Sequence, residues 1–253
     1  MSAPSKKPYG LILLVMGAVV LVVGANLWKT GLKVRRIVVE GNRIVGTNEI
    51  LQLVQVQPGS LLFDADLNSI QHNVLSHYYV KEAAVGRDLP STIHVQIVER
   101  VPVALVNRAE SLYLDEEGFV LPHTLSKALF DLPVISGISV GVSLEVGKEV
   151  EQPDVLEALV ILSTLRSVNK AQYHRISEVQ VRNGGDIVMF AAEGGVPIIV
   201  GREEIATKLA RLEKFWSEIV RDRGAQNLQY VDLRYDDQIV VRWKSQTQAA
   251  KAL

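Results

Sequence analysis

The longest apolar run of the chain lies near its N-terminus. Tyr9 to Trp28 are twenty residues without a charged side chain, and lysines flank them on both sides. At about 1.5 Å per residue, a helix of this length reaches roughly 30 Å, the thickness of a bilayer core. Aromatic residues at its two ends favour the headgroup level of a membrane. The pattern predicts one transmembrane helix over residues 9–28, after a short tail at residues 1–8.

A cleaved signal peptide is the alternative for this segment. Leu11–Val23 has the length of a signal's apolar region, and the small residues that follow it resemble a cleavage site. No polar region interrupts the segment before Trp28, so we favour an uncleaved anchor. Basic residues after the helix would by charge place the C-terminal side in the cytoplasm, but long domains translocate largely regardless of charge. These basic residues are Lys29, Lys33, Arg35 and Arg36.

Strand and helix patterns alternate over residues 32–101. Residues 34–40 are rich in β-branched side chains and predict a strand. Two short amphipathic helices are expected next, the first with Thr47 as its N-cap and the second capped by Asp66. Two further strands are predicted at Val80–Arg87 and Thr92–Glu99, and the second has an apolar residue at every second position from Ile93 to Ile97, as a half-buried strand does. The order strand–helix–helix–strand–strand predicts an α+β domain in which helices cover a small sheet.

After Pro102 the pattern changes to short strands separated by turns. Strands are predicted at 104–107, 112–115, 119–121, 132–137, 179–182, 186–190, 197–200, 228–235 and 238–243. Helices are predicted at 154–167 and 201–222. The second helix presents an apolar face of Ile205, Leu209, Leu212, Phe215, Trp216 and Ile219. We predict a β-rich domain with helices over 102–243 and a flexible tail at 244–253.

The composition excludes several classes of function. The 253 residues hold 27 basic and 28 acidic side chains, and the part after residue 31 carries a formal charge of −4, because the first 31 residues hold three lysines and no acid. This balance argues against a nucleic-acid-binding protein. The chain has no cysteine, which rules out disulfides, thiolate metal sites and cysteine nucleophiles.

Motifs that carry chemistry are missing from the sequence. The five histidines show no metal-ligand spacing, and there is no nucleophile elbow, P-loop or dinucleotide-binding motif. Two groups of acids remain, Asp64 with Asp66 and Asp115 with Glu116 and Glu117. We interpret the first as a helix cap and the second as a solvated turn. The sequence therefore predicts no catalytic residues, no cofactor and no metal.

The last predicted strand is the feature that points to association. Tyr230–Trp243 ends the predicted fold, and no later strand follows to cover it. A free strand edge can accept a partner strand through main-chain hydrogen bonds. Arg234, Tyr235 and Trp243 are residue types enriched at binding hot spots. The alternative is that Tyr235 and Trp243 pack on the protein's own core, and the sequence leaves both open.

Several segments, in this order, carry a resemblance to a known family. They are VRRIVVEGNRIVGTNEI (34–50), YYVKEAAVGRDLPSTIHVQIVERVPVALV (78–106), YLDEEGFVLP (113–122), LPVISG (132–137) and NLQYVDLRYDDQIVVRW (227–243). The combination of ERVPVA (99–104) with YVDLRY (230–235) is fairly specific. These segments resemble the FtsQ/DivIB family of bacterial cell-division proteins, whose POTRA domain has the order βααββ and precedes a β domain.

The resemblance implies a function without catalysis. The family is a single-pass scaffold of the division machinery, with a short cytoplasmic tail and two domains on the outer side of the bacterial inner membrane. The implied partners are FtsB and FtsL, with links to FtsK, FtsW and the septal synthase FtsI. The implied location is the cell membrane, enriched at the division septum, which favours export of the C-terminal part.

The resemblance also implies a binding site, because in the family FtsB adds a strand to the last strand of the β domain. By position this implicates Arg234, Tyr235 and Trp243, with strand Gln238–Val241 as the main-chain ladder. Asp237 stands where the family usually has a small polar residue. The expected partner-binding residues are Arg234, Tyr235, Asp237, Gln238, Ile239, Val240, Val241 and Trp243.

Two other functions fit parts of the pattern. A POTRA-bearing chaperone for envelope export or assembly would be expected to carry several tandem POTRA units or a following barrel, whereas this sequence predicts one unit. A membrane-anchored periplasmic hydrolase would require a cleft with converging titratable groups.

Overall fold

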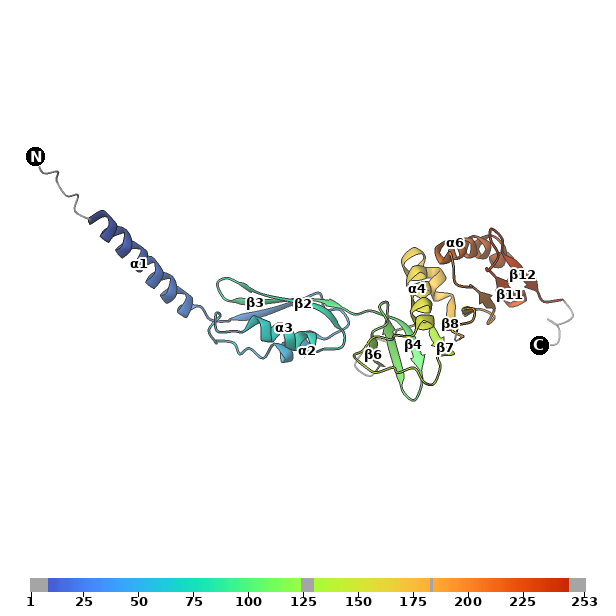
Figure 1. Ribbon diagram of the computed structural model, residues 1–253, viewed down its shortest axis with the longest axis horizontal. Coiled ribbons are helices and arrows are strands. Elements are labelled where there is room, and N and C mark those ends of the chain that lie inside the picture. The colour runs from blue at the N-terminus through green and yellow to red at the C-terminus, as the bar shows by residue number, and fades with distance from the viewer. Residues whose placement is uncertain (1–8, 124–129, 183, 246–253) are drawn as a thin grey trace, which may run out of the picture. The chain divides into compact units, whose positions relative to one another are not determined.

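The computed structural model describes residues 9–123, 130–182 and 184–245 (Figure 1). The predicted tail at residues 1–8 lies outside the described residues, as do residues 246–253 of the predicted C-terminal tail. Contacts within the chain divide it into Met1–Glu99 and Arg100–Leu253, which are called unit 1 and unit 2 below.

The first element of unit 1 is helix α1, Tyr9–Gly31. Its side chains from Ile12 to Gly24 are exposed, and most of them are large and apolar. Within the described residues, no helix combines the length and the hydropathy needed to cross a membrane.

The rest of unit 1 is a three-stranded sheet with two helices on one face (Figure 1). In chain order the elements are β1 (Arg36–Glu40), α2 (Thr47–Val54), α3 (Leu67–Leu75), β2 (Val80–Asp88) and β3 (Thr92–Glu99). Strand β3 lies in the centre, parallel to β1 and antiparallel to β2. The predicted order strand–helix–helix–strand–strand is confirmed.

Local sequence accounts for these elements. In β3, Ile93, Val95 and Ile97 are buried, whereas Val98 belongs to the opposite face of the sheet and is 48% exposed. The alternation predicted for this strand is therefore confirmed. The Asp66 carboxylate caps α3 by accepting two backbone N–H hydrogen bonds, as its position before the apolar pattern predicted. The N-cap predicted at Thr47 is wrong, because Gly46 is the N-cap of α2 and Thr47 is the first residue of the helix.

Glu99, the last residue of β3, holds the loop between β1 and α2. Its carboxylate accepts the backbone N–H groups of Arg43, Ile44 and Val45 over distances of 2.8 to 3.0 Å. Three successive N–H groups that face one carboxylate form an anion-binding concavity. In this unit the anion is a side chain of the protein itself, so the loop is fixed to the end of the central strand.

Unit 2 is built on one mixed nine-stranded sheet. Its strands are β4 (Pro102–Asn107), β5 (Ser111–Asp115), β6 (Val120–Pro122), β7 (Val134–Ser136), β8 (Ile176–Gln180), β9 (Val188–Ala191), β10 (Pro197–Ile199), β11 (Leu228–Asp232) and β12 (Val240–Trp243). Their order across the sheet is β12-β11-β10-β9-β8-β7-β4-β5-β6. The strands predicted in this part of the chain are all present, with ends that shift by a few residues.

Helices α4 (Pro153–Val168) and α6 (Ile205–Phe215) lie against this sheet and contact each other (Figure 1). Leu159, Ile161, Leu162 and Leu165 of α4 are almost completely buried and join the strands in a single core. The short helix α5, Lys170–His174, was not expected from the sequence.

Asp115 corrects one expectation, because the sequence predicted a solvated turn and the residue is buried. Its carboxylate accepts the N–H groups of Glu117 and Phe119 at 3.0 and 2.8 Å. It also accepts a hydrogen bond from Arg100 at 2.6 Å. The carbon of the Arg100 guanidinium lies 3.8 Å from the centroid of the Phe119 ring. The buried charge is thus paired and hydrogen-bonded, which is what makes its burial possible.

The long helix predicted at 201–222 is interrupted. It consists of α6, a π-helical turn at Trp216–Val220 and α7 at Arg221–Arg223. The wider π-helical turn rotates the residues that follow, so Val220 is buried and Ile219 is 39% exposed. The prediction that Ile219 lies on the buried face is therefore wrong, and Val220 occupies that position.

The loop held by Glu99 gives the first prediction. Removing the negative charge in Glu99→Gln should weaken the hydrogen bonds from residues 43–45, at a cost of about 2 kcal/mol in local stability. Native-state hydrogen exchange of these three amides should then be faster. The control is Glu82→Gln, an exposed glutamate of β2. Equal exchange rates in wild type and Glu99→Gln would show that the carboxylate does not hold the loop.

The π-helical turn gives the second prediction. Val220→Ala should lower the free energy of unfolding by about 2 kcal/mol, because it removes buried methyl groups and leaves a cavity. Ile219→Ala should cost about 1 kcal/mol or less, since the side chain is partly in solvent. Urea unfolding of both variants would test this order. A larger loss for Ile219→Ala would mean that the helix continues without the π-helical turn.

Candidate partner-binding site

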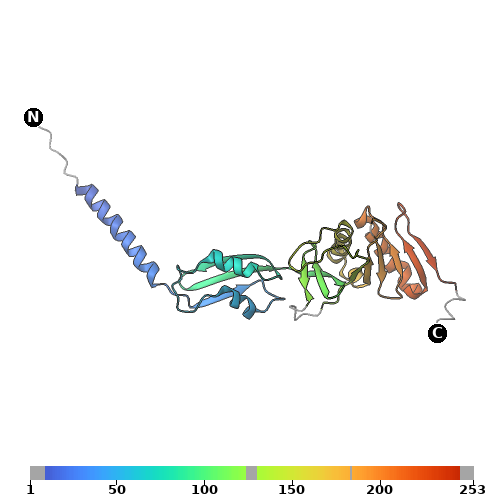
Figure 2. The same cartoon turned by 60° about the horizontal axis from the view of Figure 1, so that its bottom comes forward.

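Strand β12 forms one edge of the nine-stranded sheet, next to β11 (Figure 2). The two strands are antiparallel, with Val231 opposite Val241 and Asp232 opposite Val240. Beyond β12 the sheet has no further strand among the described residues. The expectation that the last strand is an edge strand is confirmed.

On β12 and at Ile239, the residue before it, the apolar side chains are partly buried and Arg242 is exposed. Ile239, Val241 and Trp243 pack against the core of unit 2, and Trp243 is half-buried. The carbon of the Arg223 guanidinium lies 5.2 Å from the centroid of the Trp243 ring. Arg242, between two of these residues, is exposed. For Trp243 the structure favours the alternative that the side chain packs on the protein's own core.

The turn before β12 is exposed. Tyr235 shows 47% of its surface to solvent, and Asp236, Asp237 and Gln238 are exposed as well. Asp237 adopts a φ of 56°, in the left-handed region that Asn, Asp and Gly tolerate best. The guanidinium of Arg211 donates a hydrogen bond to the Tyr235 carbonyl at 3.3 Å. The Tyr235 ring is therefore available to a partner while its main chain is held from α6.

Arg234 is engaged within its own unit. Its guanidinium donates hydrogen bonds to both carboxylate oxygens of Asp232, from Nε to Oδ1 at 3.0 Å and from Nη2 to Oδ2 at 2.6 Å. Its Nη1 donates to Asp186 at 2.8 Å. The side chain lies over Gly201, where an added Cβ would come within 3.1 Å of the Arg234 Cγ. This arrangement fixes the end of β11 to the loops beside it.

The charges of this cluster compensate one another. Burial acts to raise the pKa of the Asp232 carboxyl, but the hydrogen bonds from Arg234 and the charges of Arg234 and Lys208 outweigh it and lower that pKa. The hydrogen bond to Asp232 raises the pKa of Arg234 well above its ordinary value. Asp232 therefore stays ionised beside the turn.

Sequence reasoning missed four residues that shape this site. They are Asp186, Gly201, Lys208 and Arg211, and none of them lies within the last two strands. Lys208 is buried although its position on an amphipathic helix gave no sign of it. The alternation of Arg and Asp in VDLRYDD was the only signal, and it does not specify distant partners.

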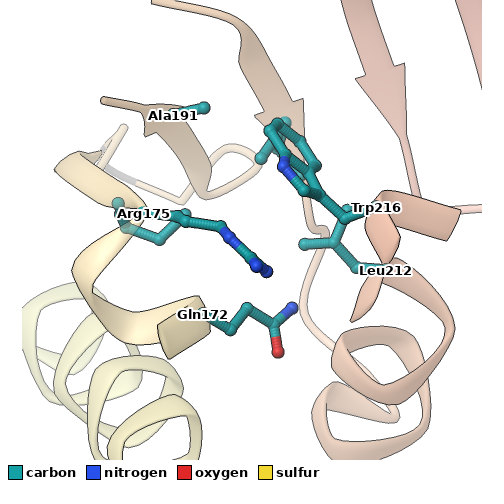
Figure 3. A pocket seen from close by; sticks show the side chains of 7 residues that line it. Gln172, Arg175, Ala191, Leu212 and Trp216 are labelled. Atoms are coloured by element: carbon teal, nitrogen blue, oxygen red, sulfur yellow. The ribbon is translucent and has the colours of Figure 1, made fainter. Parts of the chain in front are cut away.

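Unit 2 also has recesses away from β12, one of about 410 Å³ beside Lys148 and one of about 220 Å³ between α4 and α6. Within the described residues, no three His, Asp or Glu side chains are placed to hold a metal ion. A recess beside Trp216, lined also by Gln172, Arg175 and Leu212, measures about 10 Å³ (Figure 3). This volume has room for one water molecule at most.

Comparison with known proteins matches both units to one family. Residues 32–100 match the family described as "POTRA domain, FtsQ-type", and residues 104–234 match "Cell division protein FtsQ/DivIB, C-terminal". The second match ends just before the turn and β12.

Full-length relatives give the same result. Cell division protein FtsQ of Syntrophotalea carbinolica is 31% identical over 210 residues, which cover 83% of this chain and 73% of the relative. FtsQ of Geotalea daltonii is 31% identical over 215 residues, 84% of this chain and 76% of the relative. FtsQ of Rhodothermus marinus is 30% identical over 251 residues, 96% of this chain and 90% of the relative. The chain belongs to the FtsQ/DivIB family of cell division proteins.

Proposed function

We propose that this chain is a non-enzymatic, membrane-anchored scaffold of the bacterial division machinery. It binds FtsB and FtsL on the outer side of the inner membrane, and an FtsB strand adds to β12. Contacts with FtsK, FtsW and FtsI connect the assembly to septal cell-wall synthesis at the septum. The proposed organisation is a cytoplasmic tail (1–8), a membrane helix (9–28), a POTRA domain (32–101), a β domain (102–243) and a flexible tail (244–253).

The proposal rests on one observation. Strand β12 is an edge strand, and the turn before it carries an exposed aromatic residue. Edge strands present unpaired N–H and C=O groups that a partner strand can bind. The exposed ring of Tyr235 beside this edge is a typical hot-spot side chain. The half-buried Trp243 serves the binding indirectly, by holding β12 against the core.

The membrane anchor rests on α1. Its 23 residues form a helix of about 34 Å, slightly more than the hydrocarbon core of a bilayer. The apolar side chains between Ile12 and Val23 are half or more exposed, and lipid tails would cover them. Transfer of these apolar side chains from water to the lipid tails is favourable.

Arg234 has a positioning role in this proposal. Its guanidinium is already paired with Asp232 and Asp186, so a partner carboxylate would have to compete with these two side chains. Its fork geometry holds the carboxylate at the last residue of β11, directly before the turn that carries Tyr235. We infer that Arg234 fixes this turn and that Tyr235 makes the contact.

The binding site gives the third prediction. Tyr235→Ala should weaken binding of a labelled FtsB periplasmic segment, in the presence of FtsL, by roughly thirtyfold, about 2 kcal/mol. The full chain in detergent micelles would be titrated by fluorescence anisotropy. Tyr78→Ala is the matched control, since Tyr78 is 41% exposed in unit 1. Equal affinity of Tyr235→Ala and wild type would remove Tyr235 from the site, and failure of wild type to bind would overturn the proposal.

The cluster of Arg234, Asp232 and Asp186 gives the fourth prediction. The lowered pKa of Asp232 means that its ionised form stabilises the fold at pH values above about 4 and that this stability is lost as the pH falls through the folded-state pKa. Arg234→Met should therefore lower the free energy of unfolding by roughly 2 kcal/mol at pH 7, and by less below pH ~4.

Arg211→Met is the control for the fourth prediction, because Arg211 donates to a main-chain carbonyl of the same turn and not to Asp232. Its effect on urea unfolding should be small and independent of pH. A loss in Arg234→Met that does not change between pH 7 and pH 3 would show that Asp232 is not the partner that matters.

A further inference from the structure

The end of unit 1 that joins α1 has an unusual set of exposed residues. Lys33, Arg35 and Arg36 follow the helix within five residues and are all exposed. Residues 1–39 contain six basic side chains and no acid. By charge alone these cations oppose export of the domain, so the proposed orientation leaves them without an explanation.

Main-chain hydrogen bonds bring two other loops to the same end. Val34 N–H donates to the Ser60 carbonyl at 2.9 Å, and Leu62 N–H donates to the Leu32 carbonyl at 2.9 Å. Arg35 N–H donates to the Ser91 carbonyl at 2.8 Å. The loop before α3 and the β2–β3 turn therefore both lie next to the segment that leaves α1 (Figure 1).

Each of these loops exposes an apolar side chain. Leu89 at the β2–β3 turn is 55% exposed, and Phe63 in the other loop is 37% exposed. Arg87 holds the loop before α3 by donating hydrogen bonds to the carbonyls of Leu62 and Ala65 at 2.9 and 2.6 Å. We call Lys33, Arg35, Arg36, Phe63 and Leu89 the helix-side surface.

We infer that the helix-side surface binds the anionic phospholipid headgroups of the membrane in which α1 is anchored. This rests on the proposed function, since α1 must span the bilayer for the surface to meet it. Lys33 lies two residues beyond Gly31, roughly 7 Å of extended chain. The headgroup layer is roughly 5–7 Å thick on each side, and charges act over a Debye length of about 8–10 Å.

The charges and the exposed apolar side chains of this surface favour binding to a lipid surface over binding to a protein. The exposed acids at this end, Asp64, Asp66 and Asp88, lie on the loops, whereas the three cations lie on the segment nearest the helix. The cations match phosphate groups, and the two apolar side chains can enter the interfacial layer between them. Bound in this way, unit 1 rests on the bilayer by three segments of its chain.

The test uses the full chain in nanodiscs and a fluorescent dye on a single cysteine. Because the chain has no cysteine of its own, Leu89→Cys gives one labelled position. Val98→Cys is the control, since Val98 is 48% exposed near the other end of the β2–β3 hairpin. Spin-labelled lipid should quench the dye at position 89 in discs that contain phosphatidylglycerol, and much less in phosphatidylcholine alone or at high salt. The dye at position 98 should not respond.

Charge removal completes the test. Lys33→Gln, Arg35→Gln and Arg36→Gln together should abolish the quenching at position 89, with roughly a fivefold weaker contact for each cation. A charge-matched control combines Arg43→Gln, Lys214→Gln and Arg221→Gln, three exposed cations elsewhere in the chain, and should leave the quenching unchanged.

Two outcomes would overturn the inference. Equal quenching in both lipids, or in the triple variant and wild type, would show that the surface does not bind anionic headgroups. Weaker binding of FtsB and FtsL by the triple variant in detergent would make the surface a protein-docking site. An alkaline wash of proteoliposomes tests the membrane anchor separately from the headgroup contact. A chain that is washed off has no anchor. A chain that is retained but shows no quenching at position 89 refutes only the headgroup contact.

Discussion

A sheet that does not close on itself must end on a strand whose outer main-chain groups have no partner. In unit 2 the two end strands are β6 and β12. Val120 of β6 exchanges main-chain hydrogen bonds with Gly147 and Lys148, so among the described residues the open edge is that of β12. Val241 and Trp243 of β12 and the preceding Ile239 pack against the core, and β12 pairs with β11. The outer edge is open among the described residues. The order of the sheet thus makes β12 the end of the core and, in the proposed function, the edge that a partner strand binds.

Buried carboxylates end two strands of unit 2 in the same manner. Asp115 is the last residue of β5 and Asp232 the last residue of β11, and each accepts the N–H of the residue two positions on. Each also pairs with an arginine, Arg100 or Arg234. A carboxylate that bonds both to the main chain and to a guanidinium can stay ionised in the core and specify where the strand turns. The acids of this unit therefore shape turns, including the turn that presents Tyr235.

Local patterns were sufficient to predict most of the elements, and distant contacts account for what was missed. The alternation in β3 and the cap at Asp66 depend on neighbours in sequence, and both were predicted correctly. The burial of Asp115 depends on Arg100, fifteen positions away, and the pairing of Arg234 depends on Asp186, forty-eight positions away. Periodicity assumes a regular helix, so the π-helical turn shifted the buried position from Ile219 to Val220. In the candidate site, the edge position of the last strand could be predicted, whereas the exposure of Tyr235 and the partners of Arg234 could not.

The length of β12 limits what strand addition can contribute. The strand has four residues, so a partner strand gains roughly two to four main-chain hydrogen bonds, about 2–4 kcal/mol in total at the usual net value. Micromolar affinity requires about 8 kcal/mol. An aromatic anchor such as Tyr235 supplies about 2 kcal/mol more, which still leaves a deficit. If chain and partner are held by the same membrane, the effective concentration covers that deficit, because the partner no longer has to be captured from solution. In this account the edge strand provides a weak contact that a titration at high partner concentration can measure, and the proposed membrane anchor raises the occupancy of that contact.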